Sequence, residues 1–186
     1  DPYLSRGLGD VYKRQNKCLV ITAQKLMSVV INISKTYRKP IQTYSRLFEL
    51  GASEKQNLAF LIGGCVISFV SQWPVQARYA FANQQSIDEL MGAILLSNLF
   101  LLPLIFYFIS MVMYIFAKGL GSNILGVELR MIIFWAYLAA TPILLLVGIV
   151  EGFFGKNFQY FIVAGFWLLI FLTFVYSGFK LSLIHI

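Results

Sequence analysis

Residues 158–179 read FQYFIVAGFWLLIFLTFVYSGF, a run that carries no charged side chain and is almost uniformly apolar and aromatic. A helix needs about 17 to 25 mainly apolar residues to cross a hydrocarbon core of about 30 Å. The run therefore predicts a transmembrane helix, and it makes the bilayer, rather than water, the solvent in which the fold has to be explained.

The rest of the chain has the same character. Of its 186 residues, 59% are hydrophobic and 12% are charged, and the mean hydropathy is +0.74. This composition excludes a soluble enzyme, a disordered tail and a nucleic-acid-binding arm. Cys18 and Cys65 lie far apart and form no CxxC pair, so neither a disulfide framework nor a zinc ligand set is expected.

Three further spans are predicted. They cover residues 57–73, 90–117 and 131–150. The first follows a capping box that begins at Ser53, and Pro74 is expected to end it. The second follows a capping box at Ser86 and is longer than one perpendicular crossing needs, so it should tilt, protrude or bend at Pro103. A kink is expected at Pro142 in the third. The fold class is an all-α polytopic bundle.

Residues 27–56, before the first span, form a basic leader. Pro40 suits the first position of a helix. Ile41, Tyr44 and Phe48 then fall on one face, which is typical of a short amphipathic helix lying on the membrane surface. The alternative is a disordered basic leader. The region from 57 to 180 is the predicted transmembrane domain.

Both ends of the chain resemble translated sequencing-adapter DNA. Residues 10–15, DVYKRQ, and residues 181–186, LSLIHI, can be encoded by DNA strands that are reverse complements of each other. We therefore expect residues 1–15 and 181–186 to be adapter-derived and not native, and His185 to be no ligand. Met27 is a candidate start, which would place residues 16–26 upstream of it.

The distribution of basic residues predicts the orientation in the membrane. The leader carries five Lys or Arg residues, whereas each later loop carries one or two. The positive-inside rule then places the amino terminus, and with four spans also the carboxyl end, in the cytoplasm. Arg38, Lys39 and Arg46 are the residues expected to fix this topology and to attract anionic lipid, by about 1 kcal/mol for each basic residue near the surface.

The sequence predicts no catalytic, metal or cofactor site. With His185 set aside, residues 16–180 contain no histidine, which excludes His-based triads and His-ligated metals there. The carboxylates of this segment all fall in the leader, in loops or at the ends of spans. They are Glu49, Glu54, Asp88, Glu89, Glu128 and Glu151.

Small residues and one amide stand out within the spans. Small side chains one helical turn apart, or adjacent, allow another helix to approach closely. The predicted packing positions are Gly63, Gly64, Ala136, Ala140, Gly148 and Gly152. Asn98 is the strongly polar side chain deepest in a span, and we expect it to hydrogen-bond to a neighbouring helix; a substrate contact is the alternative.

Short motifs along the chain resemble the Yip (Ypt-interacting protein) membrane family, specifically its bacterial branch. They are AKGLGS at 117–122, ELR at 128–130, FWA at 134–136, TP at 141–142, RKP at 38–40, Arg46, GG at 63–64 and QWP at 72–74. The resemblance covers most of residues 27–180. It implies a polytopic helical bundle with a cytoplasmic amino terminus and, in eukaryotic relatives, binding to small GTPases and shaping of vesicles. That family often has five spans, so a fifth span stays open.

These observations favour a non-enzymatic integral protein of the bacterial cytoplasmic membrane that organises the membrane or binds partners. Its expected partners are the lipid bilayer, with anionic lipid at the cytoplasmic face, and other membrane proteins or further copies of itself. Nucleic acid is not an expected partner. The alternative is a small transporter or channel subunit in which Asn98, Pro103 and Pro142 line a cavity.

Overall fold

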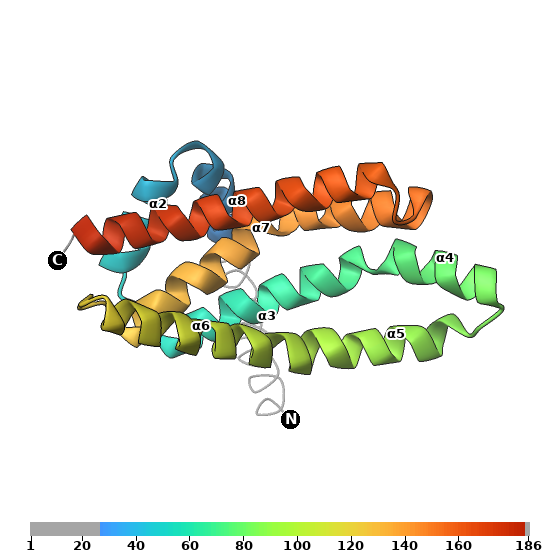
Figure 1. The fold of residues 1–186 in the computed structure, drawn as a ribbon, viewed down its shortest axis with the longest axis horizontal. Coiled ribbons are helices and arrows are strands. Elements are labelled where there is room, and N and C mark those ends of the chain that lie inside the picture. The colour runs from blue at the N-terminus through green and yellow to red at the C-terminus, as the bar shows by residue number, and fades with distance from the viewer. Residues whose placement is uncertain (1–26, 185–186) are drawn as a thin grey trace, which may run out of the picture.

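The computed structural model describes residues 27–184, and within them every element is helical (Figure 1). A helix over residues 27–38 is followed by seven α-helices and one π-helical turn. These elements are α2 (Pro40–Glu49), α3 (Glu54–Ser71), α4 (Trp73–Asn83), α5 (Ile87–Leu96), η1 (Ser97–Leu101), α6 (Leu102–Gly119), α7 (Gly126–Phe154) and α8 (Phe158–Ile184).

Four stretches of the described residues are helical, long and apolar enough to cross a membrane. They are Glu54–Asn83, Ile87–Gly119, Gly126–Phe154 and Phe158–Ser182. Figure 1 shows them running side by side along the longest axis of the molecule. The predicted all-α bundle with four spans is confirmed, and the chain has the architecture of a multi-pass membrane protein.

The helix α7 is the buried centre of the bundle. It contacts α3, α4, α6 and α8, and its residues 131–141 are all buried. Trp135 and Phe134 are fully inaccessible. The surrounding spans instead expose large apolar side chains such as Leu104 and Phe161. A bundle that buries one apolar helix and exposes apolar side chains on the others is suited to lipid, because such a surface in water would be an aggregation hazard.

The prediction that Pro74 ends the first span is wrong. After a one-residue break at Gln72, the chain continues as α4 to Asn83. Pro74 lies in the first turn of α4, where the missing N–H costs nothing because that turn has no acceptor for it. The predicted cap at the other end is present: the Ser53 hydroxyl accepts a hydrogen bond from the backbone N–H of Gln56 at 3.3 Å.

The second span, which was expected to tilt, protrude or bend at Pro103, stays helical through that residue. It is helical from Ile87 to Gly119, and a wide π-turn over Ser97–Leu101 lies immediately before the proline. A proline removes a backbone donor and crowds the preceding turn, and a π-turn is a usual way to absorb that disturbance within a helix. The predicted capping box at Ser86 is wrong, because its side chain makes no cap hydrogen bond.

The third and fourth spans extend beyond their predicted limits. The helix α7 contains Pro142 and runs from Gly126 to Phe154, several residues past residues 131–150 at each end. The last helix, α8, continues to Ile184 and so enters the segment 181–186 that we expect to be adapter-derived. None of the residues in LSLI breaks a helix, so an apolar helix extends through them whatever their origin.

The leader is more ordered than predicted. The amphipathic helix expected after Pro40 is present as α2, but its buried face is Thr43, Tyr44 and Leu47, while Ile41 is exposed. Burial against the protein, rather than against lipid alone, turns the helix to this face. The helix over residues 27–38 was not predicted. The segments 1–15 and 16–26 lie outside the described residues.

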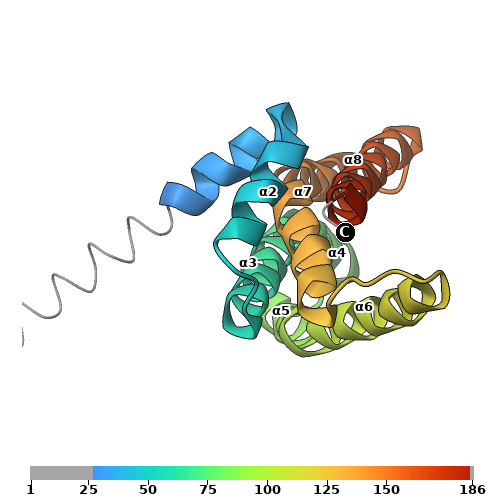
Figure 2. The same cartoon turned by 90° about the vertical axis from the view of Figure 1, so that its left-hand side faces the viewer.

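The two ends of the bundle differ. One end, here called the elbow end, holds the end of α2, the start of α3, the α6–α7 connection and the end of α8 (Figure 1). Helix 27–38 meets the bundle further inward, where Thr36 and Tyr37 contact Trp135 and Ala139 in the middle of α7. The opposite end holds the α4–α5 and α7–α8 connections. Figure 2 looks from the elbow end and shows helix 27–38 leaving the bundle sideways while α2 turns back towards α3.

Candidate functional site

Four basic side chains come together where helix 27–38 meets α2. Lys35, Arg38, Lys39 and Arg46 line one pocket of about 370 Å³, here called the basic pocket. Its remaining lining residues, Asn32, Gln42 and Thr43, are polar and uncharged. The three predicted topology residues, Arg38, Lys39 and Arg46, therefore share one concave site and are exposed. Such a site favours an anion with several oxygen atoms, because each ammonium or guanidinium group supplies donors and positive charge.

The bend that forms the basic pocket follows from the Lys39-Pro40 pair. The proline ring disfavours helical geometry at the preceding residue, and Lys39 has φ −144° and ψ 70°, outside the helical region. The Lys39 N–H still donates to the Lys35 carbonyl at 2.8 Å, so the first helix is complete up to the bend. Pro40 then begins α2.

The bend between helix 27–38 and α2, here called the elbow, is attached to α7, the central helix of the bundle. The Tyr37 hydroxyl donates to the Ala139 carbonyl at 2.8 Å, and the Trp135 indole N–H donates to the Thr36 hydroxyl at 3.2 Å. Tyr37 also packs edge-to-face on Phe174 of α8, with ring centroids 5.1 Å apart. These contacts hold the four cations in a defined position relative to α7, so the site is not a freely moving basic tail.

A third contact secures α2 and makes its attachment sensitive to alkaline pH. The buried Tyr44 hydroxyl donates to the Ile132 carbonyl of α7 at 3.3 Å. Burial raises the pKa of Tyr44 above its ordinary value of 10, and burial raises the pKa of Tyr37 as well. Because these pKa values are higher in the folded state, the stabilisation is complete below pH 10 and is lost as the pH rises above it.

We expect Tyr44→Phe to lower the free energy of unfolding by about 1 kcal/mol at neutral pH, the usual net value of one hydrogen bond. The same variant should lose less stability than the wild type between pH 10 and higher values. Thermal unfolding of detergent-purified protein across this range measures both effects. Tyr79→Phe, at an exposed tyrosine of α4, is the control. Parallel pH profiles for the wild type and Tyr44→Phe would contradict the prediction.

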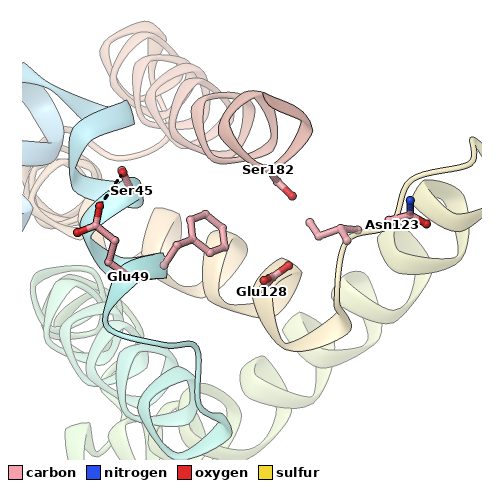
Figure 3. Close-up of a pocket in the computed structure, with 7 residues that line it drawn as sticks. Ser45, Glu49, Asn123, Glu128 and Ser182 are labelled. Carbon is pink, nitrogen blue, oxygen red and sulfur yellow. Dashed lines mark hydrogen bonds between the residues drawn. The ribbon is translucent and has the colours of Figure 1, made fainter. Parts of the chain in front are cut away.

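A second pocket at the elbow end is acidic. It measures about 320 Å³ and includes Glu49 of α2 and Glu128 of α7 (Figure 3). Each carboxylate has a local partner: Glu49 accepts from the Ser45 hydroxyl at 3.4 Å, and Glu128 accepts from the Leu125 N–H at 3.1 Å. Ser182, which also lines the pocket, belongs to the segment expected to be adapter-derived. We assign this pocket no binding role.

The structure places the predicted packing residues at contacts with α7 or on it. A Cβ at Gly64 would lie 2.6 Å from the Tyr137 ring, and a Cβ at Gly63 would lie 3.6 Å from Leu138. A Cβ at Gly152 would lie 2.5 Å from the Pro74 side chain. The remaining positions are Gly148, whose added Cβ would overlap the Ser71 carbonyl, and the buried Ala136 and Ala140.

Asn98 makes a local contact. Its side-chain amide donates to the Ile94 carbonyl, four residues earlier in the same span, at 3.1 Å. The amide lies in the π-turn η1, where the helix is widened. Pro142 is exposed, whereas Pro103 is buried. None of Asn98, Pro103 and Pro142 lines the basic or the acidic pocket.

Two features of the elbow end were missed from the sequence. Arg130 and Glu54 form an ion pair between the starts of α7 and α3, and the buried Asn57 amide donates to the Val127 carbonyl at 2.9 Å. The ion pair is partly exposed and stabilises little. Lys35 was not singled out for the basic site. The spacing of Val29, Ile33 and Thr36 was the signal that could have placed Lys35 on a helix.

Residues 27–184 contain no group of three or more His, Cys, Asp and Glu side chains that could hold a metal ion. Comparison of the chain with models of protein families, with curated proteins and with solved structures returned no match.

Proposed function

We propose that this protein is a non-enzymatic, Yip-like scaffold of the bacterial cytoplasmic membrane, which organises the bilayer or binds other membrane proteins. The observation that carries the proposal is the basic pocket, a fixed array of four cations attached to a multi-pass bundle. Anionic lipid of the cytoplasmic leaflet is the partner that this array attracts first, because that leaflet carries net negative charge and attracts basic residues that lie near a membrane-spanning segment.

The charge distribution of the whole bundle supports the orientation. Between residues 27 and 184, the elbow end and the bend between helix 27–38 and α2 together hold eight of the ten basic residues, and only Arg78 and Lys156 belong to the opposite end. These eight are Lys35, Arg38, Lys39, Arg46, Lys55, Lys118, Arg130 and Lys180. By the positive-inside rule, the elbow end faces the cytoplasm.

Two further features support a scaffold over an enzyme. The carboxylates of the described region lie at the two ends of the bundle, and those in the acidic pocket are held by local hydrogen bonds. The outer faces of α5, α6 and α8 expose many large apolar side chains, which offers wide surfaces for packing against lipid, other membrane proteins or a second copy. The motif resemblance to the Yip family favours the same kind of role.

The proposal is tested by reconstituting the full chain into phosphatidylcholine vesicles with or without phosphatidylglycerol. We expect the protein to cluster or reshape the vesicles that contain phosphatidylglycerol, as seen by electron microscopy, and to leave a trapped dye inside. Neutralising the pocket with Arg38→Gln and Lys39→Gln should weaken this effect. The matched control is Lys118→Gln with Lys180→Gln, which removes two cations of the same end that do not line the pocket.

Unchanged vesicles together with solute uptake would overturn the scaffold proposal. Solute uptake that is lost in the Asn98→Leu variant would favour the transporter hypothesis, in which the polar side chain of the second span binds the transported solute. The local hydrogen bond of Asn98 to Ile94 gives that hypothesis no support.

A further inference from the structure

A large apolar groove adjoins the basic pocket. It measures about 1070 Å³ and lies between helix 27–38, the end of α2 and the first half of α3, with Trp135 and Leu138 of α7 among its lining residues. Gly63 of α3 also lines it, and because glycine has no side chain, this residue leaves the groove open at its position. Lys55 is the one charged residue among those that line the groove.

The groove and the basic pocket form one continuous surface. Asn32 lines both of them. On helix 27–38, Ser28, Asn32 and Lys35 follow each other at spacings of four and three residues, so they occupy one face, and Lys39 follows directly after the end of the helix. Ser28 lines the groove, whereas Lys35 and Lys39 line the basic pocket. A ligand lying along this face would therefore meet apolar walls at one end and cations at the other.

The same division is present on α2. Gln42, Thr43 and Arg46 line the basic pocket, whereas Leu47, further along the helix, and Leu50, directly after its end, line the groove. The two helices converge at Lys39 and diverge towards α3. The cations thus gather in the narrow part of the angle, and the apolar walls form its wide part.

We propose that this surface is a binding site for one anionic phospholipid. Its phosphate lies in the basic pocket against Lys35, Lys39 and Arg46, and one acyl chain lies in the apolar groove beside Gly63 and Ala59. This assignment rests on the proposed function, in which the elbow faces the cytoplasmic leaflet, and it extends that function by naming a discrete site and the class of its ligand.

Charge complementarity selects an anionic lipid. No carboxylate lines the basic pocket. A zwitterionic headgroup would therefore place its own cation beside four other cations, and the repulsion between like charges would disfavour its binding. A lipid also fits the position of the groove, because Val66 in its wall and the neighbouring α3 side chains Leu58 and Val70 are exposed on the outside of the bundle. In a bilayer these side chains lie against acyl chains, so the groove opens onto the same lipid.

Native mass spectrometry of the full chain purified in detergent tests the site. The probe is palmitoyl-oleoyl phosphatidylglycerol, compared with the phosphatidylcholine of the same chains. We expect one phosphatidylglycerol to be retained per chain, and Lys35→Gln with Arg46→Gln to weaken its binding by about 30-fold, since each basic residue near an anionic surface contributes about fivefold. Lys118→Gln with Lys180→Gln is the matched control and should have little effect.

A second pair of variants tests the groove. Ala59→Trp fills it from an exposed position of α3 and should abolish retention of the long-chain lipid, whereas Leu58→Trp, exposed next to it but outside the groove, should not. Inorganic phosphate and glycerophosphoglycerol should compete only weakly, because they lack the chain. Near-UV circular dichroism verifies that both tryptophan variants are folded.

Three outcomes would overturn the assignment. They are equal retention of phosphatidylcholine, competition by inorganic phosphate as strong as by the lipid, and an Ala59→Trp variant that changes the oligomeric mass but not the lipid count. The last outcome would make a second copy of the chain the occupant. Loss of this site with vesicle reshaping retained would leave the scaffold intact, and the reverse result would remove the scaffold but keep the site.

Discussion

Substituting alanine at both Gly148 and Gly152 is expected to cost about 3 kcal/mol or more of stability, enough to unfold much of the protein in detergent. A methyl group on Gly148 would overlap the Ser71 carbonyl, and one on Gly152 would lie 2.5 Å from Pro74. Both obstacles belong to the junction of α3 and α4: the Ser71 backbone carbonyl blocks the atom added at Gly148, and the rigid ring of Pro74, with its backbone carbonyl carbon at 2.8 Å, blocks the atom added at Gly152. The helices have to move apart, and the contacts of α7 with α3 and α4 are lost.

Unfolding by sodium dodecyl sulfate in mixed micelles, followed by tryptophan fluorescence, measures this loss. Gly92→Ala and Gly165→Ala are the controls, because a Cβ at either position meets nothing within 4 Å. Alanine has the higher helix propensity, by about 1 kcal/mol at most, so the controls should be unchanged or slightly more stable. Equal losses in both pairs would show that helix packing at Gly148 and Gly152 is not the cause.

Reversing the charge of Arg38, Lys39 and Arg46 with glutamate is expected to invert or scramble the orientation of the bundle. The leader, residues 27–56, would then hold two basic residues in place of five, and the positive-inside signal would fall to the level of the later loops. Reporter fusions in the α4–α5 and α6–α7 connections should report exchanged sides for a large fraction of the chains.

The conservative triple variant Arg38→Lys, Lys39→Arg and Arg46→Lys is the control for this experiment. It keeps every charge while changing every side chain, so its reporters should match the wild type. An unchanged orientation in the glutamate variant would remove the topological role of these three residues. The basic residues of the later loops would then have to determine the orientation of the bundle in the membrane.

The membrane-spanning helices were predictable because the length of an uninterrupted apolar run can be counted directly in the sequence. Residues 131–150 and 158–179 lie inside α7 and α8 as expected. The effects of Pro74 and Pro103 were not predictable in the same way, because a proline is compatible with a stop, a first turn or a π-turn. Neighbouring helices decide among these, and the pairing of helices cannot be read from one apolar run.

The candidate site was predictable only in part. Counting charges identified Arg38, Lys39 and Arg46, but it did not show that they share a pocket with Lys35. That grouping depends on the bend at Lys39 and on the docking of Tyr37 and Tyr44 against α7. Both contacts are made to backbone carbonyls about ninety or more residues away. Every residue type has a backbone carbonyl, so the sequence does not show which residue acts as the acceptor.

The central position of α7 has a consequence for biogenesis. α7 contacts α3, α4, α6 and α8, yet among the four candidate spans of residues 27–184 it is the third along the chain. The first two of these spans, Glu54–Asn83 and Ile87–Gly119, therefore lie in the bilayer without α7 until the residues beyond Gly126 have been synthesised. During that interval the small side chains of α3 are open to any other helix, so the nascent chain is most vulnerable to mispairing before its third span arrives.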